Sequence, residues 1–518
     1  MPVIVHRSPF PDIAIPPQTI GACVFAGFAG REDEPVLIDG TTGRSLTGRE
    51  LVDAVRRLAG GLTASGFGAG RVVAIMAPNL PEYALIFHGI ACAGGTVTTV
   101  NPACTADELR FQIQDCGAVL LVTLPALLAT ARAAVAGTAV REVAVLGEPA
   151  EGAVAFEALL GPPIAQVPVD LERHPLVMPY SSGTTGLPKG VLLSHANLVA
   201  NVAQIAALEP VRPGERSLAV LPFFHIYGMT VLMSYILAGG GALVTLPRFD
   251  LEAALRLAEA HRMRRLFVVP PVVLALAKHP MVDDFDLSAL EIVFSGAAPL
   301  GAELEAACAR RLGCAVAQGY GMTEMSPVSH FSPAGRARPG SAGTTVPNTA
   351  CRIVDPETGA DLRAGEVGEL WVQGPQVMLG YLNNPEATEA TLRDGWLRTG
   401  DLGSIDADGG LFIVDRVKEL IKVKGFQVPP AELEALLVSH PDVADAAVIG
   451  LPDEECGEVP AAFVVRAPGA DPLPETLQAF VAGHVASYKR LRKLTFVDAI
   501  PKSPSGKILR RVLRAGTA

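Results

Sequence analysis

The order of helical and extended segments along the chain is the feature that most restricts its fold. Between residues 50 and 146, and again between 193 and 321, amphipathic helical patterns alternate with short apolar runs. The expected helices are 51–65, 81–93, 105–117, 196–208, 251–261 and 301–312, and the expected strands are 72–76, 96–100, 119–123, 143–146, 266–269, 292–295 and 315–318. Strand-helix-strand alternation predicts parallel sheets covered by helices.

The pattern changes twice towards the C-terminal end. Short strands with turns between 351 and 371 predict a small β unit. The last hundred residues alternate again, with helices expected at 430–438 and 473–485 and a strand at 446–449. We therefore predict an α/β protein with a large N-terminal domain, 1–415, of mainly parallel sheets plus the β unit. A smaller, compact α+β domain, 416–518, follows it.

Charge and cysteine content exclude several classes of function. A net charge of −11 argues against a general nucleic-acid binder, which needs a broad basic surface. The eight cysteines form no C-x-x-C pair, as expected of reduced thiols in a cytoplasmic protein. Residues 217–247 carry no charged side chain, but Pro222, His225, Gly228 and the glycines 239–241 divide them into pieces too short to span a membrane. We expect a buried strand, a loop and a core helix there, and no stable membrane insertion.

One stretch combines glycine, hydroxyl groups and a cation in the manner of a phosphate-binding loop. Residues 180–190 read Tyr-Ser-Ser-Gly-Thr-Thr-Gly-Leu-Pro-Lys-Gly between two apolar runs, which predicts strand, loop, strand. Backbone N–H groups, hydroxyls and the Lys189 ammonium suit a polyphosphate. Because Gly190 follows Lys189 where a Walker A loop needs Ser or Thr, the stretch is not a P-loop. A Ser/Thr/Gly linker is the alternative interpretation.

Two further polar stretches, 295–299 and 318–324, follow predicted strands. Ligands of open α/β sheets bind at such strand ends. Tyr320, between two glycines, can offer a flat face to a base, and Glu324 can hold Mg²⁺ through its carboxylate. Ordinary turns are the alternative for either stretch.

Three C-terminal stretches place charged groups on turns or edges. Asp401, within 396–403, suits hydrogen bonding to a ribose diol. In 415–427, alternating residues from Ile421 onward predict an extended edge with Lys422 and Lys424 on one face. The basic tail at 501–511 places Lys507 on a glycine-kinked loop that can reach a phosphate. Taken singly, each is equally compatible with a solvated turn, edge strand or basic tail.

Taken together and in this order, five of these stretches resemble motifs of the acyl-adenylate-forming superfamily, within it the branch of 4-coumarate:CoA ligase and firefly luciferase. The matching stretches are 181–190, 318–324, 396–403, 415–427 and 505–507, and the likeness runs from about residue 30 to residue 515. The resemblance implies Mg-ATP, a carboxylic acid and coenzyme A as reactants.

The resemblance also implies a role for each matching residue. The β- and γ-phosphates would be held by Ser181, Ser182, Gly183, Thr184, Thr185, Gly186 and Lys189. The rest of the nucleotide would meet Gly296, Ala297, Ala298, Gln318, Gly319, Tyr320, Gly321, Thr323, Asp401, Arg416 and Gln427, with Mg²⁺ at Glu324. The catalytic residues implied are Lys507, His225, Thr323 and Lys422, and Lys424 and Gly425 accompany Lys422 beside the thiol.

The implied reaction has two steps that use two positions of the C-terminal domain. The acid first attacks the α-phosphate of ATP, and Lys507 offsets the charge that develops. The domain then turns about Lys418, withdrawing Lys507 and presenting the strand around Lys422, and a thiol displaces AMP.

The acyl pocket implied by the resemblance is apolar. Its expected lining is Tyr227, Met229, Phe294, Gly296, Gly321, Pro327 and Val328. Phe294 stands where plant 4-coumarate ligases typically carry lysine, and Met325-Ser326 replaces the usual small pair. Phe294 is therefore expected to shorten or narrow the cavity, which fits an aryl-propenoic or medium-chain acid.

Other functions remain open at this point. The chain could load a carrier protein instead of free CoA, act as a luciferase-type oxygenase, or bind nucleotide without chemistry. We expect a monomer or homodimer.

Overall fold

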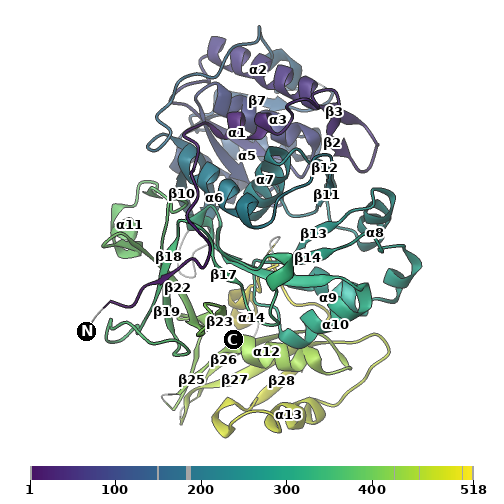
Figure 1. Ribbon diagram of the computed structural model, residues 1–518, viewed down its shortest axis with the longest axis vertical. Helices are drawn as coiled ribbons and strands as arrows, with labels where there is room; N and C mark the ends of the chain where they lie inside the picture. Colours follow the sequence, from purple (N-terminus) through teal and green to yellow (C-terminus); the bar gives the residue numbers. More distant parts are fainter. Residues whose placement is uncertain are drawn as a thin grey trace.

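The structure, a computed structural model, describes residues 3–148, 151–181, 188–424, 426–453, 455–503 and 506–515. Figure 1 shows the N-terminal sheets at the top, a second parallel sheet with its helices at the right, an antiparallel β unit at the left and the C-terminal part at the bottom. The predicted fold class is confirmed by this arrangement. The boundary between residues 415 and 416 stays a prediction.

The first parallel sheet has the order β20-β10-β9-β5-β4-β6-β7-β8. Its strands from β9 to β8 are parallel, whereas β10 is antiparallel to both β9 and β20. The bounds are β4 Val72–Met76, β5 Thr96–Val100, β6 Ala118–Thr123, β7 Glu142–Val145, β8 Val154–Ala155, β9 Pro175–Ser181, β10 Lys189–Ser194 and β20 Gly380–Tyr381. Pairing of β9 with β10 sets Ser181 opposite Lys189. The two strands predicted on either side of this loop are thereby confirmed, and residues 182–187 between them lie outside the described residues.

Helices flank this sheet, and those at 51–65, 81–93, 105–117 and 196–208 lie where the amphipathic pattern predicts them. The bounds are α1 Ile20–Ala26, α2 Gly48–Ala64, α3 Pro81–Cys92, α4 Ala106–Cys116, α5 Leu128–Val135 and α6 His195–Leu208. A capping box opens α4: the Thr105 hydroxyl accepts from the Glu108 N–H, and the Glu108 carboxylate accepts from the Thr105 N–H.

A second parallel region is built from β11-β12-β2-β3 and β13-β14-β15-β16-β17. The strand bounds are β2 Pro35–Asp39, β3 Ser45–Thr47, β11 Arg216–Ala219, β12 Ala242–Thr245, β13 Arg265–Val268, β14 Ile292–Ser295, β15 Ala315–Gly321, β16 Val328–Phe331 and β17 Thr344–Thr345. The helix bounds are α7 Tyr235–Ala238, α8 Leu251–Ala260, α9 Pro270–Lys278 and α10 Ala302–Leu312. Strands β13, β14 and β15 run parallel, so their carboxyl ends meet at one edge.

The uncharged stretch 217–247 is more divided than expected. It contains most of β11, the π-helical turn Gly228–Ser234 with the short α7, and all of β12. The expected strand, loop and core helix are therefore present, and β12 is a second strand that was not expected. Within the ranges given above, no helix is both long and apolar enough to cross a bilayer.

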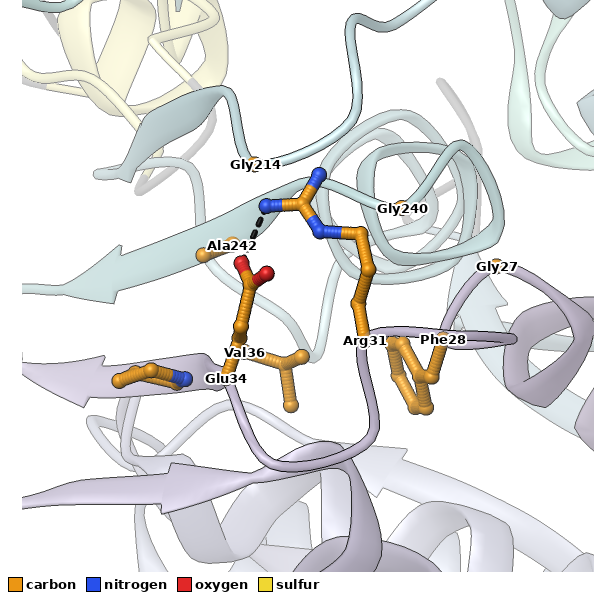
Figure 2. Close-up of a pocket in the computed structure, with 9 residues that line it drawn as sticks. Gly27, Phe28, Arg31, Glu34, Val36, Gly214, Gly240 and Ala242 are labelled. Atoms are coloured by element: carbon orange, nitrogen blue, oxygen red, sulfur yellow. Dashed lines mark hydrogen bonds and ion pairs between the residues drawn. The ribbon is translucent and has the colours of Figure 1, made fainter.

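Gly240 of this stretch and Gly27 of the loop after α1 allow backbone segments to touch. A Cβ added at Gly27 would lie 2.3 Å from the Leu237 carbonyl oxygen, and one at Gly240 would lie 2.7 Å from the Gly27 carbonyl oxygen. Figure 2 shows the small pocket of about 220 Å³ left beside this contact, with the Arg31–Glu34 ion pair at its edge. The glycines that interrupt the apolar run thus serve close packing.

The β unit is an antiparallel sheet of order β1-β18-β19-β22-β21, with β23 added beside β22. The bounds are β1 His6–Arg7, β18 Ala350–Val354, β19 Gly368–Gln373, β21 Leu392–Arg393, β22 Trp396–Ile405 and β23 Leu411–Arg416, and helix α11 spans Pro385–Thr391. Pairing of β22 with β23 sets Asp401 opposite Arg416.

The C-terminal part has its own sheet, β25-β24-β27-β26 with β28 beside β27, and its own buried core. The bounds are β24 Ile421–Val423, β25 Phe426–Val428, β26 Val443–Asp453, β27 Gly457–Arg466, β28 Lys493–Phe496, α12 Pro430–Ser439, α13 Pro474–Ala482 and α14 Arg510–Ala515. The extended backbone predicted from Ile421 is present as β24, but the prediction of an edge was wrong, because β24 lies between β25 and β27. The strand also ends before Lys424, whose φ is +49°.

Candidate functional site

A pocket of about 640 Å³ opens at the carboxyl ends of β13, β14 and β15. It is lined by Ile205, His225, Ile226, Tyr227, Val231, Phe267, Phe294, Ser295, Gly296, Ala297, Gly319, Tyr320, Gly321, Met322, Thr323, Pro327, Val328, Phe331 and Lys507. The lining therefore draws on α6, the loop before the π-helical turn, three strand ends and the C-terminal tail. Its position is the one expected for a ligand site of an α/β sheet.

One wall of the pocket is aromatic. The Phe294 ring stacks on Phe267 with centroids 5.1 Å apart and contacts Phe331 at 4.9 Å. Phe294 is 2% exposed, so its ring is fixed between its two neighbours. Phe267 and Phe331 were not singled out from the sequence, because apolar residues inside strands look like core. Met229, expected in the lining, is instead buried in the core.

Glycine is required at two points of the lining. A Cβ at Gly296 would lie 2.9 Å from Cε1 of Tyr227, and a Cβ at Gly321 would lie 2.2 Å from the Pro327 carbonyl oxygen. Gly296 therefore lets the Tyr227 ring lie flat against the strand end, and Gly321 lets two backbone segments touch. Tyr227, Gly296, Gly321 and Pro327 line the cavity as expected, together with Val328.

A buried hydrogen-bonded group joins β15 to β22 and β23. The Tyr320 hydroxyl donates to Asp401 Oδ2 at 2.6 Å, and Arg416 Nε lies 3.2 Å from Asp401 Oδ1. Burial, followed by the Asp401 charge, raises the pKa of Tyr320. Edge contact with His330 supports the Tyr320 ring from behind. This fixes an aromatic face next to a carboxylate and a guanidinium, as a nucleoside requires.

A second polar group lies around Glu324. The Ser181 hydroxyl donates to Glu324 Oε1 at 3.2 Å, and the Tyr381 hydroxyl donates to the same oxygen at 2.9 Å. Lys189 Nζ lies 4.2 Å from the centroid of the Tyr381 ring. Residues Ser182, Gly183, Thr184, Thr185 and Gly186, predicted to hold phosphates, lie outside the described residues.

Lys507 brings a cation from the C-terminal part into the pocket. Burial and, after it, the Arg416 charge lower the pKa of Lys507 to about 8, although the Asp401 and Glu324 charges oppose the shift. The Lys507 N–H donates to the Ser503 hydroxyl at 3.1 Å, which shapes the loop.

His225 faces the same space as Lys507. Burial and the Lys507 charge lower the pKa of His225 to about 3, so its ring is neutral at pH 7. Its Nδ1 accepts from the Tyr227 N–H at 3.3 Å, which leaves Nε2 as the protonated nitrogen and a hydrogen-bond donor.

Several predicted residues lie apart from the pocket. The Gln318 amide is buried and bonds to the backbone of Leu300 and to Glu305, so it holds the loop before α10 and does not line the cavity. Lys422, Lys424 and Gln427 are exposed on the β24–β25 hairpin and are not among the lining residues. Gly425 lies outside the described residues. Ala298 borders the lining next to Ala297, whose φ is +72°.

A divalent cation could be held here only with help from a ligand. Among the residues described, no three His, Cys, Asp or Glu side chains are grouped to bind a metal ion. Mg²⁺ is usually bound by one or two carboxylates together with substrate phosphates, and the buried Glu324 carboxylate fits that pattern.

Comparisons with known proteins agree with this geometry. Residues 25–382 match the AMP-binding enzyme family, and residues 432–507 match the AMP-binding enzyme C-terminal domain. The chain is 45% identical to 4-coumarate–CoA ligase 5 of Oryza sativa subsp. japonica over 99% of this chain and 97% of that protein.

Solved structures resemble the chain over almost its whole length. The anthranilate CoA ligase AuaEII in complex with anthranoyl-AMP has a TM-score of 0.90 at 26% identity and covers 97% of this chain and 98% of its own. ATP-bound MatB from Rhodopseudomonas palustris has a TM-score of 0.88 at 31% identity and covers 96% of this chain and 99% of its own. The chain therefore belongs to the AMP-binding enzyme family.

Proposed function

We propose that the chain is an ATP-dependent carboxylic acid:CoA ligase that forms an acyl-adenylate and then an acyl-CoA thioester. The observation that carries the proposal is the entry of Lys507 into a largely apolar pocket that is also lined by Tyr320. The Tyr320 hydroxyl is bonded to Asp401, which pairs with Arg416. An acid and a nucleotide can meet there under one mobile cation. The 4-coumarate–CoA ligase relative supports the same reaction.

In the first step a carboxylate oxygen attacks the α-phosphorus of ATP, and the bond to pyrophosphate breaks. We assign Lys507 to offset charge on the transferring phosphate and Thr323 to contact it. The neutral His225 would donate a hydrogen bond to the carboxylate without competing for its charge. Ser181 and Lys189 would hold the leaving pyrophosphate, and bound Mg²⁺ at Glu324 would offset phosphate charge.

The nucleoside would be held by the group around Asp401. The Tyr320 face would stack on adenine against Gly296 and Ala297, while Asp401 and Arg416 would bind the ribose hydroxyls. The hydrogen bond already made by the Tyr320 hydroxyl to Asp401 supports this assignment, because it fixes ring and carboxylate together before a ligand arrives.

In the second step a CoA thiolate attacks the acyl carbonyl, and AMP leaves with the electrons of the broken C–O bond. The exposed Lys422 and Lys424 lie on a hairpin away from the pocket, which supports a turn of the C-terminal domain about Lys418 between the steps.

The acid is proposed to be an aryl-propenoate of the cinnamate class. The rings of Phe267, Phe294 and Phe331 present aromatic surface that suits a flat aryl group. We also propose that the protein is a cytoplasmic monomer or homodimer. The net charge of −11 supports the further proposal that it has no nucleic-acid partner.

The test is a screen with purified chain, ATP, Mg²⁺ and CoA over cinnamates, benzoates and fatty acids of graded length. We expect pyrophosphate release matched by thioester, highest with cinnamates. Pyrophosphate–ATP exchange without thioester would indicate a different acyl acceptor, such as a carrier protein. No turnover with any acid would reduce the chain to a nucleotide-binding module.

A further inference from the structure

Helix α12 of the C-terminal part is held at both ends by charged residues that precede the proposed hinge. At its start, Asp415 Oδ2 accepts a hydrogen bond from the Ala431 N–H at 2.9 Å. At its end, Lys278 Nζ, on the last residue of α9, donates to the Val438 carbonyl oxygen at 3.0 Å and lies 3.4 Å from that of Val443. Figure 1 shows α12 beneath α9 and α10.

The charges at the two ends of α12 have favourable signs. The first N–H groups of a helix and its last carbonyls lack partners within the helix, and the helix dipole is positive at the start and negative at the end. A carboxylate at Ala431 and an ammonium at Val438 satisfy both ends. The N-cap residue Pro429 offers no side-chain cap, so the N–H groups at the start of α12 need a partner from elsewhere.

The middle of α12 also touches the N-terminal part. A Cβ added at Gly301, the N-cap residue of α10, would lie 3.4 Å from the Ala435 Cβ. That distance is ordinary contact for one methyl group, so any larger side chain at Gly301 would push α12 away. The helix is thus seated along its length.

Inside the C-terminal part, α12 is joined to the loop that carries Lys507. Arg510 Nη2 donates to both carboxylate oxygens of Glu434, at 2.8 and 2.9 Å, and Arg510 Nε donates to the Val448 carbonyl at 3.2 Å. The Val448 N–H donates back to Glu434 at 2.8 Å. Arg510 lies three residues after Lys507. Its buried ion pair with both oxygens of Glu434 therefore ties the segment that carries Lys507 to α12.

We propose that Lys278 and Asp415 are positioning residues that hold α12, and through it Lys507, in the arrangement for the adenylation step. The proposal rests on the proposed function. Both residues precede Lys418, so a turn of the C-terminal domain about that residue breaks both contacts. The two residues therefore favour the first step and have no part in the second.

The first test compares the two half-reactions in Lys278→Met. We expect pyrophosphate–ATP exchange to fall roughly tenfold, the effect of one hydrogen bond to a charged group, while thioester formation from supplied acyl-adenylate keeps its rate. Lys278→Arg should restore the exchange. The matched control is Arg311→Met. The described partners of Arg311 are Asp283 and the Leu276 carbonyl, and both belong to the N-terminal part, so this variant removes a charge without touching α12. Equal loss in both half-reactions, or none in either, would overturn the proposal.

The second test does not depend on catalysis. Trypsin cleaves after Arg416 and Lys418, so the rate of cleavage at 416–418 reports how firmly the C-terminal part is held. We expect several-fold faster cleavage there in Lys278→Met and in Gly301→Leu, which removes no charge, at an unchanged unfolding temperature. Unchanged cleavage in both variants refutes the positioning role, even if the chain makes no thioester from any acid and the proposed function fails.

Discussion

Raising the pH from 7 to 9 should suppress the adenylation step by removing the charge of Lys507. Burial lowers the pKa of this ammonium to about 8, so the proton is lost well below the ordinary range for lysine. With that pKa, about nine-tenths of the side chain is charged at pH 7 and about one-tenth at pH 9. If only the charged form works, kcat/KM for ATP falls about tenfold over this interval.

The measurement is pyrophosphate–ATP exchange without CoA, followed from pH 6.5 to 10. The profile of kcat/KM reports the free enzyme, whereas kcat reports the ATP complex. Because the bound phosphates stabilise the ammonium, the alkaline fall in kcat should lie at higher pH than the fall in kcat/KM. The substrate carboxylate is ionised throughout and contributes no slope.

Lys507→Arg is the matched control, since a guanidinium stays charged across the whole range. Its rate should be lower, because the longer group fits the loop less well, but its alkaline limb should vanish. Two results would refute the reasoning: a flat wild-type profile in kcat/KM, or an arginine variant that keeps the same limb. Either would mean that another group sets the pH dependence.

Two further changes test the walls of the pocket. Phe294→Ala should shift the preference in the substrate screen from cinnamates towards longer or bulkier acids. Because a buried ring is lost, it should also lower the free energy of unfolding in denaturant by about 3 kcal/mol. An unchanged substrate preference would show that Phe294 is not part of the cavity wall. Tyr320→Phe should raise KM for ATP by up to about tenfold with little change in kcat, because it removes one hydrogen bond to a buried carboxylate. A lower kcat at constant KM would instead indicate a role in the transition state.

The sequence predicted the parallel sheets well because their strands are continuous apolar runs bounded by turns. Strands β4, β5 and β14 have the expected limits, and α4 lies within the expected range 105–117. The hairpin at Lys424 was missed because alternation of apolar and basic residues looks the same in a straight strand and in one that turns. Only the backbone reveals the left-handed residue at the bend.

The site was less accessible to sequence reasoning. Tyr320, Asp401 and Arg416 stand on different strands, and only the order of the motifs indicated that they meet. Gln318 has the composition of a ligand-binding strand end, yet its amide is used by Leu300 and Glu305. The contact of Lys278 with α12 could not be recognised from the sequence, because a lysine at the end of a helix is common and its partner lies 160 residues further along the chain.

The pairing of β1 with β18 bears on how the chain folds. His6 pairs with Cys351, and the Ser8 hydroxyl donates to the Thr345 carbonyl across 337 residues. During synthesis the first strand therefore has no partner until most of the chain has left the ribosome, and contacts of such separation form slowly. Until then the backbone of β1 is open to pairing with another chain. A growing chain therefore carries this short strand unpaired until residue 351 is made, and Lys507 has still to be synthesised at that point.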